Sequence, residues 1–230
     1  MEKFIKIKDT DEKFRVNNIY CIGKNYLEHI KEFKNQEIPT EPVVFCKPNS
    51  SVITPDIGIK IPDFNGNKIS GNLQNETEIV IAIGKDGHKI SRENSFDYIK
   101  GIAIGLDMTL RDIQSKAKEK GLPWVISKGF YTSSPISEII PFNKISNPDN
   151  LSFNLKVNGE VRQKGNTSDM MFKIDFIISY LSEIFYLSEG DLIFTGTPEG
   201  ISKMNEGDKL EVTLLDENSS ELISFKTFIV

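Results

Sequence analysis

The sequence has few cysteines and no excess of positive charge. Only two of its 230 residues are cysteine, Cys21 and Cys46, and their positions match neither a zinc site nor a disulfide framework. Lys and Arg number 28 against 33 Asp and Glu, which gives a formal net charge of -5, and the basic residues are scattered. We therefore expect a cytoplasmic protein with reduced cysteines that binds neither nucleic acid nor a membrane.

Long apolar runs are also missing. The N-terminus alternates charged and apolar residues without an apolar signal core, so we expect no export signal. The most apolar region, residues 172–187, is interrupted by Lys173, Asp175 and Glu183 and is too short to span a bilayer comfortably, which predicts a packed helix. A chain that is 38% hydrophobic at this length supports one substantial core. We expect one globular domain over 19–230, preceded by a short N-terminal strand segment over 1–18.

What the sequence does contain is a pair of acids at the start of an apolar strand, expected over 73–84. Side chains alternate along a strand, so Glu76 and Glu78 share one face. Two neighbouring carboxylates beside a buried run are unfavourable unless they share a proton or hold a cation between them. The pair predicts a metal site or, alternatively, two solvated acids where the strand leaves the core.

A third acid, Asp107, ends another buried strand and is followed by a helix expected over 110–121, with Gly121 as its stop. Arg111 and Gln114 lie one turn apart on that helix. Asp107 is either a helix cap or a third oxygen ligand. Correspondingly, Arg111 and Gln114 either form a surface face or present donors to a substrate anion.

A histidine and an acid three residues apart make a candidate catalytic base. His29 and Glu32 lie on a helix expected over 24–33, where their side chains can touch. A carboxylate orients an imidazole and raises its basicity, which suits general-base catalysis. The alternative is an ordinary surface pair.

Two further segments have possible binding roles. Lys128 lies in an apolar strand expected over 123–130, where a lysine either extends outward to solvent or meets an anion. Thr197 lies in a tight Gly/Pro loop after a strand, over 190–200. The loop lacks the lysine of a phosphate-binding P-loop. Its hydroxyl groups and amides either hold a small carboxylate or form an ordinary turn.

The remaining segments predict local elements. Asn158-Gly159 is a strong hairpin turn signal between strands over 151–157 and 160–164. Residues 166–169 offer N-caps to the apolar helix that runs to about residue 187. Residues 209–230 supply the closing strands.

The order of these features closely resembles that of the fumarylacetoacetate hydrolase family, over about residue 19 to the C-terminus. The segments that carry the resemblance are Gly23-Lys24-Asn25-Tyr26 with His29 and Glu32, Lys47-Pro48, Glu76-x-Glu78, Gly105-Leu106-Asp107 with Arg111 and Gln114, Lys128-Gly129-Phe130, Asn166-Thr167-Ser168-Asp169-Met170 and Phe194-Thr195-Gly196-Thr197-Pro198-Glu199-Gly200. The short, single-domain members that act on acylpyruvates and oxaloacetate are the most similar. Their resemblance implies an α+β fold that is predominantly β, a mixed β-roll with flanking helices, and a homodimer.

The resemblance also implies the roles of single residues. It assigns Mg²⁺, with Mn²⁺ or Ca²⁺ as alternatives, to Glu76, Glu78 and Asp107. It assigns catalysis to His29, Glu32 and Lys128, with the segment 29–32 as a lid, and substrate contacts to Lys24, Arg111, Gln114 and Thr197. Departures from the family pattern, at Gln74-Asn75, at Tyr131 and at Lys24 in place of a common Arg, leave the metal ligands intact and the substrate preference open.

These residues permit enolate chemistry on a small pyruvate-derived dicarbonyl acid. A chelated 2-oxo group is an electron sink, so the expected activity is acylpyruvate hydrolysis or oxaloacetate decarboxylation or tautomerisation. The alternative enzyme is a dehydratase or isomerase of a sugar-derived or aromatic-catabolic 2-oxo acid. A catalytically silent metabolite-binding dimer is a further alternative, but it would be marked by loss of a ligand acid, Lys128 or the His29–Glu32 pair, and all of these are present.

Overall fold

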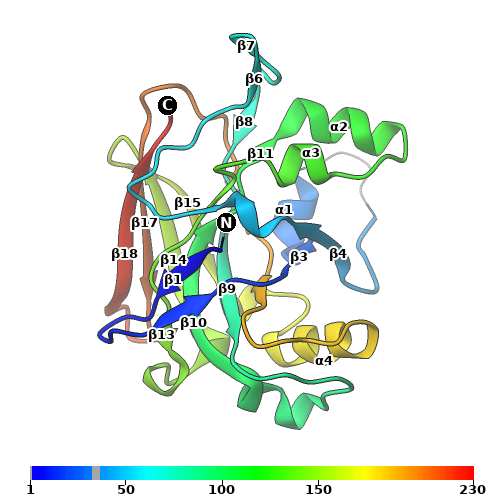
Figure 1. Ribbon diagram of the computed structural model, residues 1–230, viewed down its shortest axis with the longest axis vertical. Coiled ribbons are helices and arrows are strands. Elements are labelled where there is room, and N and C mark those ends of the chain that lie inside the picture. Colours follow the sequence, from blue (N-terminus) through cyan, green and yellow to red (C-terminus); the bar gives the residue numbers. More distant parts are fainter. Residues whose placement is uncertain (1, 33–36) are drawn as a thin grey trace.

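The computed structural model describes residues 2–32 and 37–230 and is organised around a six-stranded mixed sheet (Figure 1). The strand order is β13-β10-β9-β16-β3-β4, and neighbouring strands are antiparallel except for the parallel pair β16 and β3. The strands of this sheet are β3 (Ile19–Gly23), β4 (Val43–Lys47), β9 (Thr77–Ile83), β10 (Ile99–Leu106), β13 (Ile140–Pro141) and β16 (Leu192–Phe194).

A four-stranded antiparallel sheet lies beside it, in the order β15-β14-β17-β18 (Figure 1). Its strands are β14 (Ser152–Val157), β15 (Glu160–Asn166), β17 (Lys209–Leu215) and β18 (Glu221–Phe228). The hairpin expected around Asn158-Gly159 is confirmed. Both turn residues have positive φ, 53° and 87°, as the tight turns of hairpins require.

Short strand pairs and helices complete the fold. The pairs are β1 (Phe4–Lys6) with β2 (Lys13–Arg15), β5 (Val52–Ile53) with β12 (Ser134–Pro135), β6 (Asp63–Phe64) with β7 (Asn67–Lys68), and β8 (Leu73–Gln74) with β11 (Thr109–Leu110). The α-helices are α1 (Leu27–Lys31), α2 (Arg111–Glu119), α3 (Val125–Lys128) and α4 (Ile174–Ile184). The 3₁₀ helices are η1 (Asn49–Ser51), η2 (Arg92–Tyr98), η3 (Phe142–Lys144), η4 (Pro148–Asn150) and η5 (Thr167–Asp169). This arrangement confirms the predominantly β, α+β fold with flanking helices.

The core lies on both faces of β9, which explains its continuous apolar sequence. Ile79, Ile81 and Ile83 join the larger apolar cluster, which includes residues of the four-stranded sheet. Val80 and Ala82 join a smaller cluster that contains apolar side chains of β1 and β2. The N-terminal strand pair therefore shares a core with the six-stranded sheet, and the division into 1–18 and 19–230 stays a prediction.

The prediction of an apolar strand over 123–130 was wrong, because this segment contains the one-turn helix α3. The backbone N–H groups of Ser127 and Lys128 donate to the carbonyl of Trp124 at 2.9 and 3.0 Å. Val125 and Ile126 are 48% and 63% exposed, so their apolar character does not mark a buried strand. The helical turn instead leaves Lys128 buried.

Two other boundaries differ from expectation. The strand expected over 73–84 is divided into β8 and β9, because the side-chain oxygen of Asn75 accepts hydrogen bonds from Ser202 between them. Asn166 caps η5, accepting from the N–H of Ser168 at 2.7 Å, and α4 begins only at Ile174 and ends at Ile184. A contact with Ser202 thus interrupts the expected strand, and the 3₁₀ helix η5 takes the place of the first part of the expected helix.

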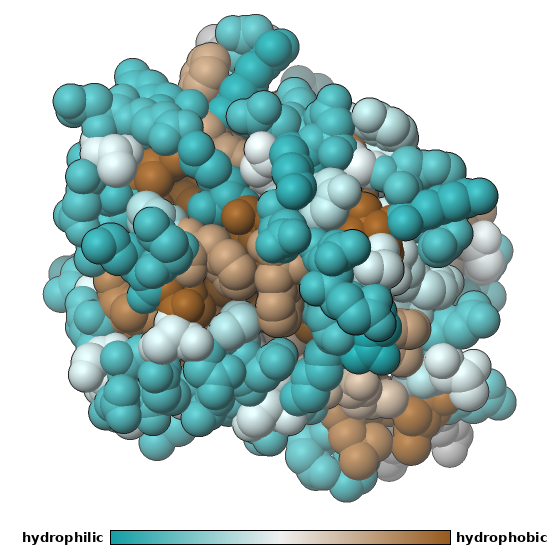
Figure 2. All heavy atoms as spheres, turned by 90° about the horizontal axis from the view of Figure 1, so that it is seen from below, coloured by the Kyte–Doolittle hydropathy of each residue, from teal (hydrophilic) through white to brown (hydrophobic). Residues whose placement is uncertain are grey.

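The lower face of the molecule is mainly polar (Figure 2). Apolar side chains are visible in a hollow near the middle of this view and in a group at its lower right. Within the described residues, no helix combines the length and apolar character needed to cross a membrane.

Candidate active site

Three buried carboxylates meet where β9 begins and β10 ends. Glu76 directly precedes β9, Glu78 lies within it, and Asp107 directly follows β10. The antiparallel register pairs Gly105 with Glu78, so the start of one strand lies beside the end of the other. One oxygen from each acid lies within 4.8 Å of the other two, and the three residues are 6%, 2% and 0% exposed. Strand pairing thus assembles the predicted ligand set from distant parts of the sequence.

Cationic side chains offset two of these acids. Lys128 Nζ lies 2.5 Å from Glu76 Oε2 and 2.6 Å from Asp107 Oδ2, and Arg111 pairs with the other oxygen of Glu76. Lys47 Nζ lies 2.6 Å from Asp107 Oδ1. Burial opposes the charge on Glu76, but Lys128 and Arg111 outweigh it and hold the pKa of Glu76 far below its usual range. Burial likewise opposes the charge on Lys128, but Asp107 and Glu76 raise the pKa of that lysine.

Glu78 differs from the other two acids, because no salt bridge reaches it from the residues that the structure describes. Its Oε2 accepts a hydrogen bond from the N–H of Gly196 at 2.7 Å. Burial first, then the charges of Asp107 and Glu76, raise the pKa of Glu78 well above its usual range. A buried acid facing two others is a position that a cation would stabilise. Because all the donors are carboxylate oxygens, the residues fit a hard divalent ion such as Mg²⁺ or Mn²⁺.

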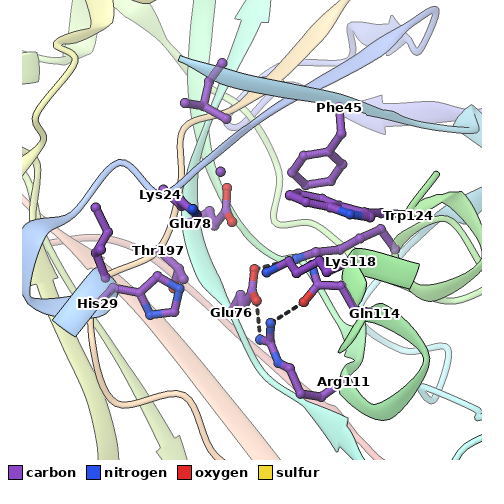
Figure 3. Close-up of a pocket in the computed structure, with 14 residues that line it drawn as sticks. Lys24, His29, Phe45, Glu76, Glu78, Arg111, Gln114, Lys118, Trp124 and Thr197 are labelled. Atoms are coloured by element: carbon purple, nitrogen blue, oxygen red, sulfur yellow. Dashed lines mark hydrogen bonds and ion pairs between the residues drawn. The ribbon is translucent and has the colours of Figure 1, made fainter. Parts of the chain in front are cut away.

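The predicted base and its orienting acid are in contact. His29 Nδ1 lies 2.9 Å from Glu32 Oε2, and Glu32 Oε1 accepts from the N–H of Gly200 at 2.8 Å. Burial opposes the charge on Glu32, but the hydrogen bonds of His29 and Gly200 outweigh it and lower the pKa of Glu32. His29 is buried and points toward the side of the pocket where Thr197 lies (Figure 3). The expected helix is confirmed as the shorter α1, and residue 33 lies outside the described residues.

The opposite side of the pocket is formed by α2 (Figure 3). Arg111 Nη1 donates to Gln114 Oε1 at 2.5 Å, and Arg111 Nε donates to Gln74 Oε1 at 2.7 Å. These bonds fix the guanidinium group beside Glu76. Arg111 and Gln114, expected one turn apart on this helix, are thus buried and hydrogen-bonded to each other, and they do not form a surface face.

The hydroxyl group of Thr197 is already engaged within the protein. It donates to the carbonyl oxygen of Thr77 at 2.9 Å and accepts from Gln163 Nε2 at 2.7 Å. Lys24, which has a positive φ of 58°, lies nearby at the end of β3. Both residues line the pocket.

Eight of the ten residues expected in the site line one pocket, and Glu32 and Asp107 contact its lining residues His29 and Lys128. Sequence reasoning gave no role to five residues in or around it: Phe45, Lys47, Lys118, Trp124 and Gln163. Lys47 had one usable signal, since it is a charged residue that ends an apolar strand. The other four had no recognisable signal: Phe45 and Gln163 meet partners far away in the sequence, and nothing in the sequence marks the contact of Lys118 with Trp124 across the loop after α2.

Comparison with known proteins agrees with this geometry. The fumarylacetoacetate (FAA) hydrolase C-terminal family matches residues 18–225. Oxaloacetate tautomerase FAHD1, mitochondrial, from Bos taurus is 43% identical over 194 residues, 84% of this chain and 85% of that protein. Its Arabidopsis thaliana counterpart is 45% identical over 192 residues, 84% of this chain and 83% of that protein.

Solved structures are similar over 94–100% of the chain. Fumarylpyruvate hydrolase from Pseudomonas aeruginosa, in complex with Mn²⁺ and pyruvate, has a TM-score of 0.91 at 33% identity, covering 100% of this chain and 96% of that chain. A 2-hydroxyhepta-2,4-diene-1,7-dioate isomerase from Mycobacterium marinum has a TM-score of 0.78 at 30% identity, covering 94% and 75%. The chain therefore belongs to the fumarylacetoacetate hydrolase family of enzymes.

Proposed function

We propose that this enzyme is a Mg²⁺-dependent hydrolase or lyase of a small pyruvate-derived dicarbonyl acid. The reaction is acylpyruvate C–C hydrolysis or the decarboxylation or tautomerisation of oxaloacetate. The observation that carries the proposal is one pocket in which a buried carboxylate cluster with Lys128 faces a histidine–glutamate pair. The names of relatives, an oxaloacetate tautomerase and a fumarylpyruvate hydrolase, support the same class of substrate.

Glu76, Glu78 and Asp107 would hold the divalent ion. When bound, such an ion polarises a 2-oxo group and stabilises the negative charge that develops on its oxygen. The Mn²⁺ in the fumarylpyruvate hydrolase structure supports a divalent metal. We propose Mg²⁺ as the metal, since oxygen-only ligands suit it, with Mn²⁺ or Ca²⁺ as substitutes.

The residues around the cluster would bind and orient the substrate. Arg111, Gln114 and Lys24 present donors to its carboxylate from two sides of the pocket. Because the hydroxyl proton of Thr197 is donated to Thr77, this loop would contribute backbone N–H groups or the hydroxyl oxygen. Lys128 places a positive charge where the 2-oxo oxygen becomes negative.

His29 and Glu32 would supply the hydrolytic water. His29 takes a proton from water as the water oxygen bonds to the distal carbonyl carbon, and Glu32 stabilises the charged imidazole. The bond between that carbon and C3 then breaks, its electron pair stays on C3, and the proton held by His29 is returned there. The products are a carboxylic acid and pyruvate. With oxaloacetate, CO₂ leaves C3, the electron pair of the broken bond stays on C3, and C3 takes a proton from solvent to give pyruvate. Alternatively, a proton moves from C3 to the 2-oxo oxygen. Neither reaction consumes water.

Turnover with and without metal tests this function. Purified protein is given oxaloacetate or acetylpyruvate with Mg²⁺ and then with excess chelator, while pyruvate release and enol absorbance are followed. Turnover that disappears with chelator supports the proposal, and the preferred compound identifies the reaction. Failure of both compounds, with intact Mg²⁺-dependent oxalate binding in calorimetry, would favour the dehydratase or isomerase alternative. Full Mg²⁺ affinity in Glu76→Ala would refute the ligand assignment.

Substitution of the base separates hydrolysis from the other reactions. His29→Ala should lower the kcat of acylpyruvate hydrolysis by about 10²–10⁴-fold, the usual contribution of a general base. Tautomerisation of oxaloacetate should fall much less, because no water must be activated. An equal loss in both reactions would show that His29 serves closure or folding of α1 instead.

We also propose a homodimer in the cytosol. An apolar groove along the edge strand β4, next to residues 122–125, supports self-association, because unpaired strand edges are normally covered. Light scattering, which gives the particle mass in solution, tests whether the protein is a dimer.

Two free cysteines support a reducing compartment such as the cytosol. The curated relatives compared above are named mitochondrial, so cell fractionation is the relevant test of location.

A further inference from the structure

The backbone at Thr132 adopts a conformation that its side chain disfavours. Its φ is 76°, in the left-handed region. Seven non-glycine residues that the structure describes have a positive φ, and Thr132 is the only one of them that is branched at Cβ. A branched side chain crowds the backbone in this region. Such a conformation persists only where surrounding contacts enforce it, and strained residues of this kind cluster at active sites.

The contact that enforces this conformation is a pair of hydrogen bonds to Lys60. Thr132 is 2% exposed, and its hydroxyl oxygen accepts from the backbone N–H of Lys60 at 2.9 Å. The same hydroxyl group donates to the carbonyl oxygen of Lys60 at 3.2 Å. The preceding residue, Ile59, is bonded to the end of the chain, by its N–H to Phe228 and by its carbonyl to Val230. Thr132 is thus tied to a segment that is anchored beside β18.

Ser133, the next residue, contacts three parts of the carboxylate site. It is 0% exposed, and its Oγ donates to the carbonyl oxygen of Lys128 at 2.8 Å. Its own carbonyl oxygen accepts from Lys47 Nζ at 3.0 Å and from the N–H of Met108 at 2.9 Å. Lys128 and Lys47 are the two ammonium groups paired with Asp107, and Met108 directly follows that acid. A shift of Ser133 would therefore displace both lysines and the acid between them.

The loop over 129–132 has little freedom to absorb such a shift. A Cβ atom at Gly129 would lie 2.5 Å from Pro48 Cδ, so the loop packs directly against the residue that follows β4. The N–H of Ser133 donates to the carbonyl oxygen of Phe130 at 3.0 Å and closes the turn. The position of Ser133 therefore depends on where this loop is tied to the rest of the protein.

We propose that Thr132 and Ser133 are positioning residues, which hold Lys128 and Lys47 in place against Asp107. The strain at Thr132 follows from two demands on one loop, since its hydroxyl group bonds the segment beside β18 while the next residue bonds the site. This inference rests on the proposed function, in which Lys128 stabilises the negative charge of the 2-oxo oxygen. A small displacement of that ammonium group would weaken catalysis without removing any group from the pocket.

Thr132→Val tests the two hydrogen bonds, because valine has the shape of threonine without its hydroxyl group. It should lower kcat for the preferred compound, oxaloacetate or acetylpyruvate, by about 10–100-fold, as expected when a charged group is misplaced. KM should change by no more than about twofold, because the 2-oxo oxygen gains its negative charge only during the reaction. Oxalate affinity in the presence of Mn²⁺ should fall with kcat, since oxalate is negatively charged throughout.

Two control variants separate positioning from stability. Thr132→Ser keeps the hydroxyl group and should retain kcat and oxalate affinity within about twofold. Thr167→Val removes two bonds of the same kind, because Thr167 is 0% exposed, accepts from the N–H of Leu151 and donates to the carbonyl of Pro148. It should lower the unfolding free energy in chelator about as much as Thr132→Val does. Its kcat, measured well below the unfolding temperature, should be unchanged.

Ser133→Ala removes the bond to the carbonyl of Lys128 and leaves the backbone bonds in place. It should lower kcat and oxalate affinity by about fivefold, which corresponds to one net hydrogen bond. If Thr132→Val does not fold, this variant decides, and unchanged values would overturn the proposal. Unchanged kcat in Thr132→Val, or an equal loss of kcat in Thr132→Ser or in Thr167→Val, would overturn it as well.

Failure of the proposed function would give a different result. If the unaltered protein turns over neither compound but binds oxalate with Mn²⁺, the proposed reaction fails, and oxalate affinity alone decides whether Thr132 positions the site. An unaltered protein that binds no oxalate would refute both proposals.

Discussion

Charge balance at single residues explains how a buried acidic cluster exists within this fold. Glu76 and Asp107 have ionic partners in Lys128, Lys47 and Arg111, whereas Glu78 has only the N–H of Gly196 among the described residues. An isolated charge in a protein interior is costly unless it is paired or neutralised. Glu78 is therefore the acid at which function and stability conflict most directly.

Replacing Glu78 should expose this conflict. Glu78→Gln keeps an acceptor for Gly196 and is neutral at every pH, so it avoids the cost of either keeping a proton on a buried acid or ionising it beside Asp107 and Glu76. The metal-free variant should therefore be more stable at pH 7 and should bind no divalent ion. The raised pKa of Glu78 determines whether stability rises or falls with pH. The folded wild type holds a proton that the unfolded chain releases above its usual pKa near 4.5, so its stability falls as pH rises through the folded pKa.

The advantage of Glu78→Gln should therefore grow between pH 5 and 8, as measured by urea unfolding in chelator. A variant that is less stable than wild type throughout this range would contradict the electrostatic explanation.

A second prediction at the residue scale concerns the contribution of Lys47 to stability. Lys47→Met removes a fully buried partner of Asp107 and a hydrogen bond to the carbonyl of Ser133, and should cost about 3 kcal/mol of unfolding free energy. Lys60→Met is the control, because the Lys60–Asp63 pair is largely exposed and such pairs contribute at most about 1 kcal/mol. Chemical denaturation measures the unfolding free energy of both variants. Comparable losses of unfolding free energy would show that burial does not determine how much an ion pair contributes to stability.

At the scale of elements, β15 holds the loop that closes one side of the site. Gln163 on β15 accepts from Asn75 and from the N–H of Thr77, and donates to Thr197 and to the carbonyl of Pro198. One buried amide thus connects the segment before β9 with the loop over 196–200. The same loop donates backbone N–H groups to Glu78 and to Glu32.

Gln163→Glu should disturb that loop without changing side-chain size. Its second oxygen would face the carbonyl of Pro198, an acceptor, where the amide now donates. We expect a loss of about 1–3 kcal/mol in stability and weaker Mn²⁺-dependent oxalate binding. Lys164→Gln, at an exposed position on the same strand, should leave both unchanged. Unaltered oxalate affinity in Gln163→Glu would mean that β15 does not position the site.

Elements governed by local geometry could be predicted from sequence, and those governed by distant contacts could not. The turn at Asn158-Gly159 and the shared face of Glu76 and Glu78 follow from backbone preferences and from strand alternation. The helical turn at Lys128 was missed, because the apolar residues before it resemble a strand although they lie on the surface. The break before β9 was also missed, since it depends on Ser202, far along the chain.

At the scale of the whole molecule, the sheet register decides the site. Glu76 directly precedes β9 and Asp107 directly follows its antiparallel partner β10, whereas Lys128 lies in a helix and Thr197 in a loop after β16. Sequence spacing alone does not give these distances, so the assembled set could be expected only from the ordered resemblance to a family. Lys118 and Trp124 gave no such signal, and only the folded chain brings them together.

Removing the metal should leave this architecture intact. Because the chain supplies its own cations to Glu76 and Asp107, the chelated protein should keep its circular dichroism spectrum and unfold cooperatively. Adding Mn²⁺ at about 100 times its Kd should raise the unfolding free energy by about 2.7 kcal/mol, as expected for a ligand that binds only the folded state. Calorimetric unfolding with and without chelator measures both, and a chelated protein that is already unfolded would contradict the expectation.

The ammonium group of Lys128 has a consequence for how the enzyme meets its surroundings. It is tethered between two of the acids that a divalent ion needs, so every incoming ion competes with a cation that cannot diffuse away. We expect this competition to keep metal affinity modest, so that occupancy follows the free ion concentration instead of saturating. The rate of catalysis in the cell would then follow the free concentration of the divalent ion. The ammonium group of Lys128 would set the ion concentration at which the site is half occupied.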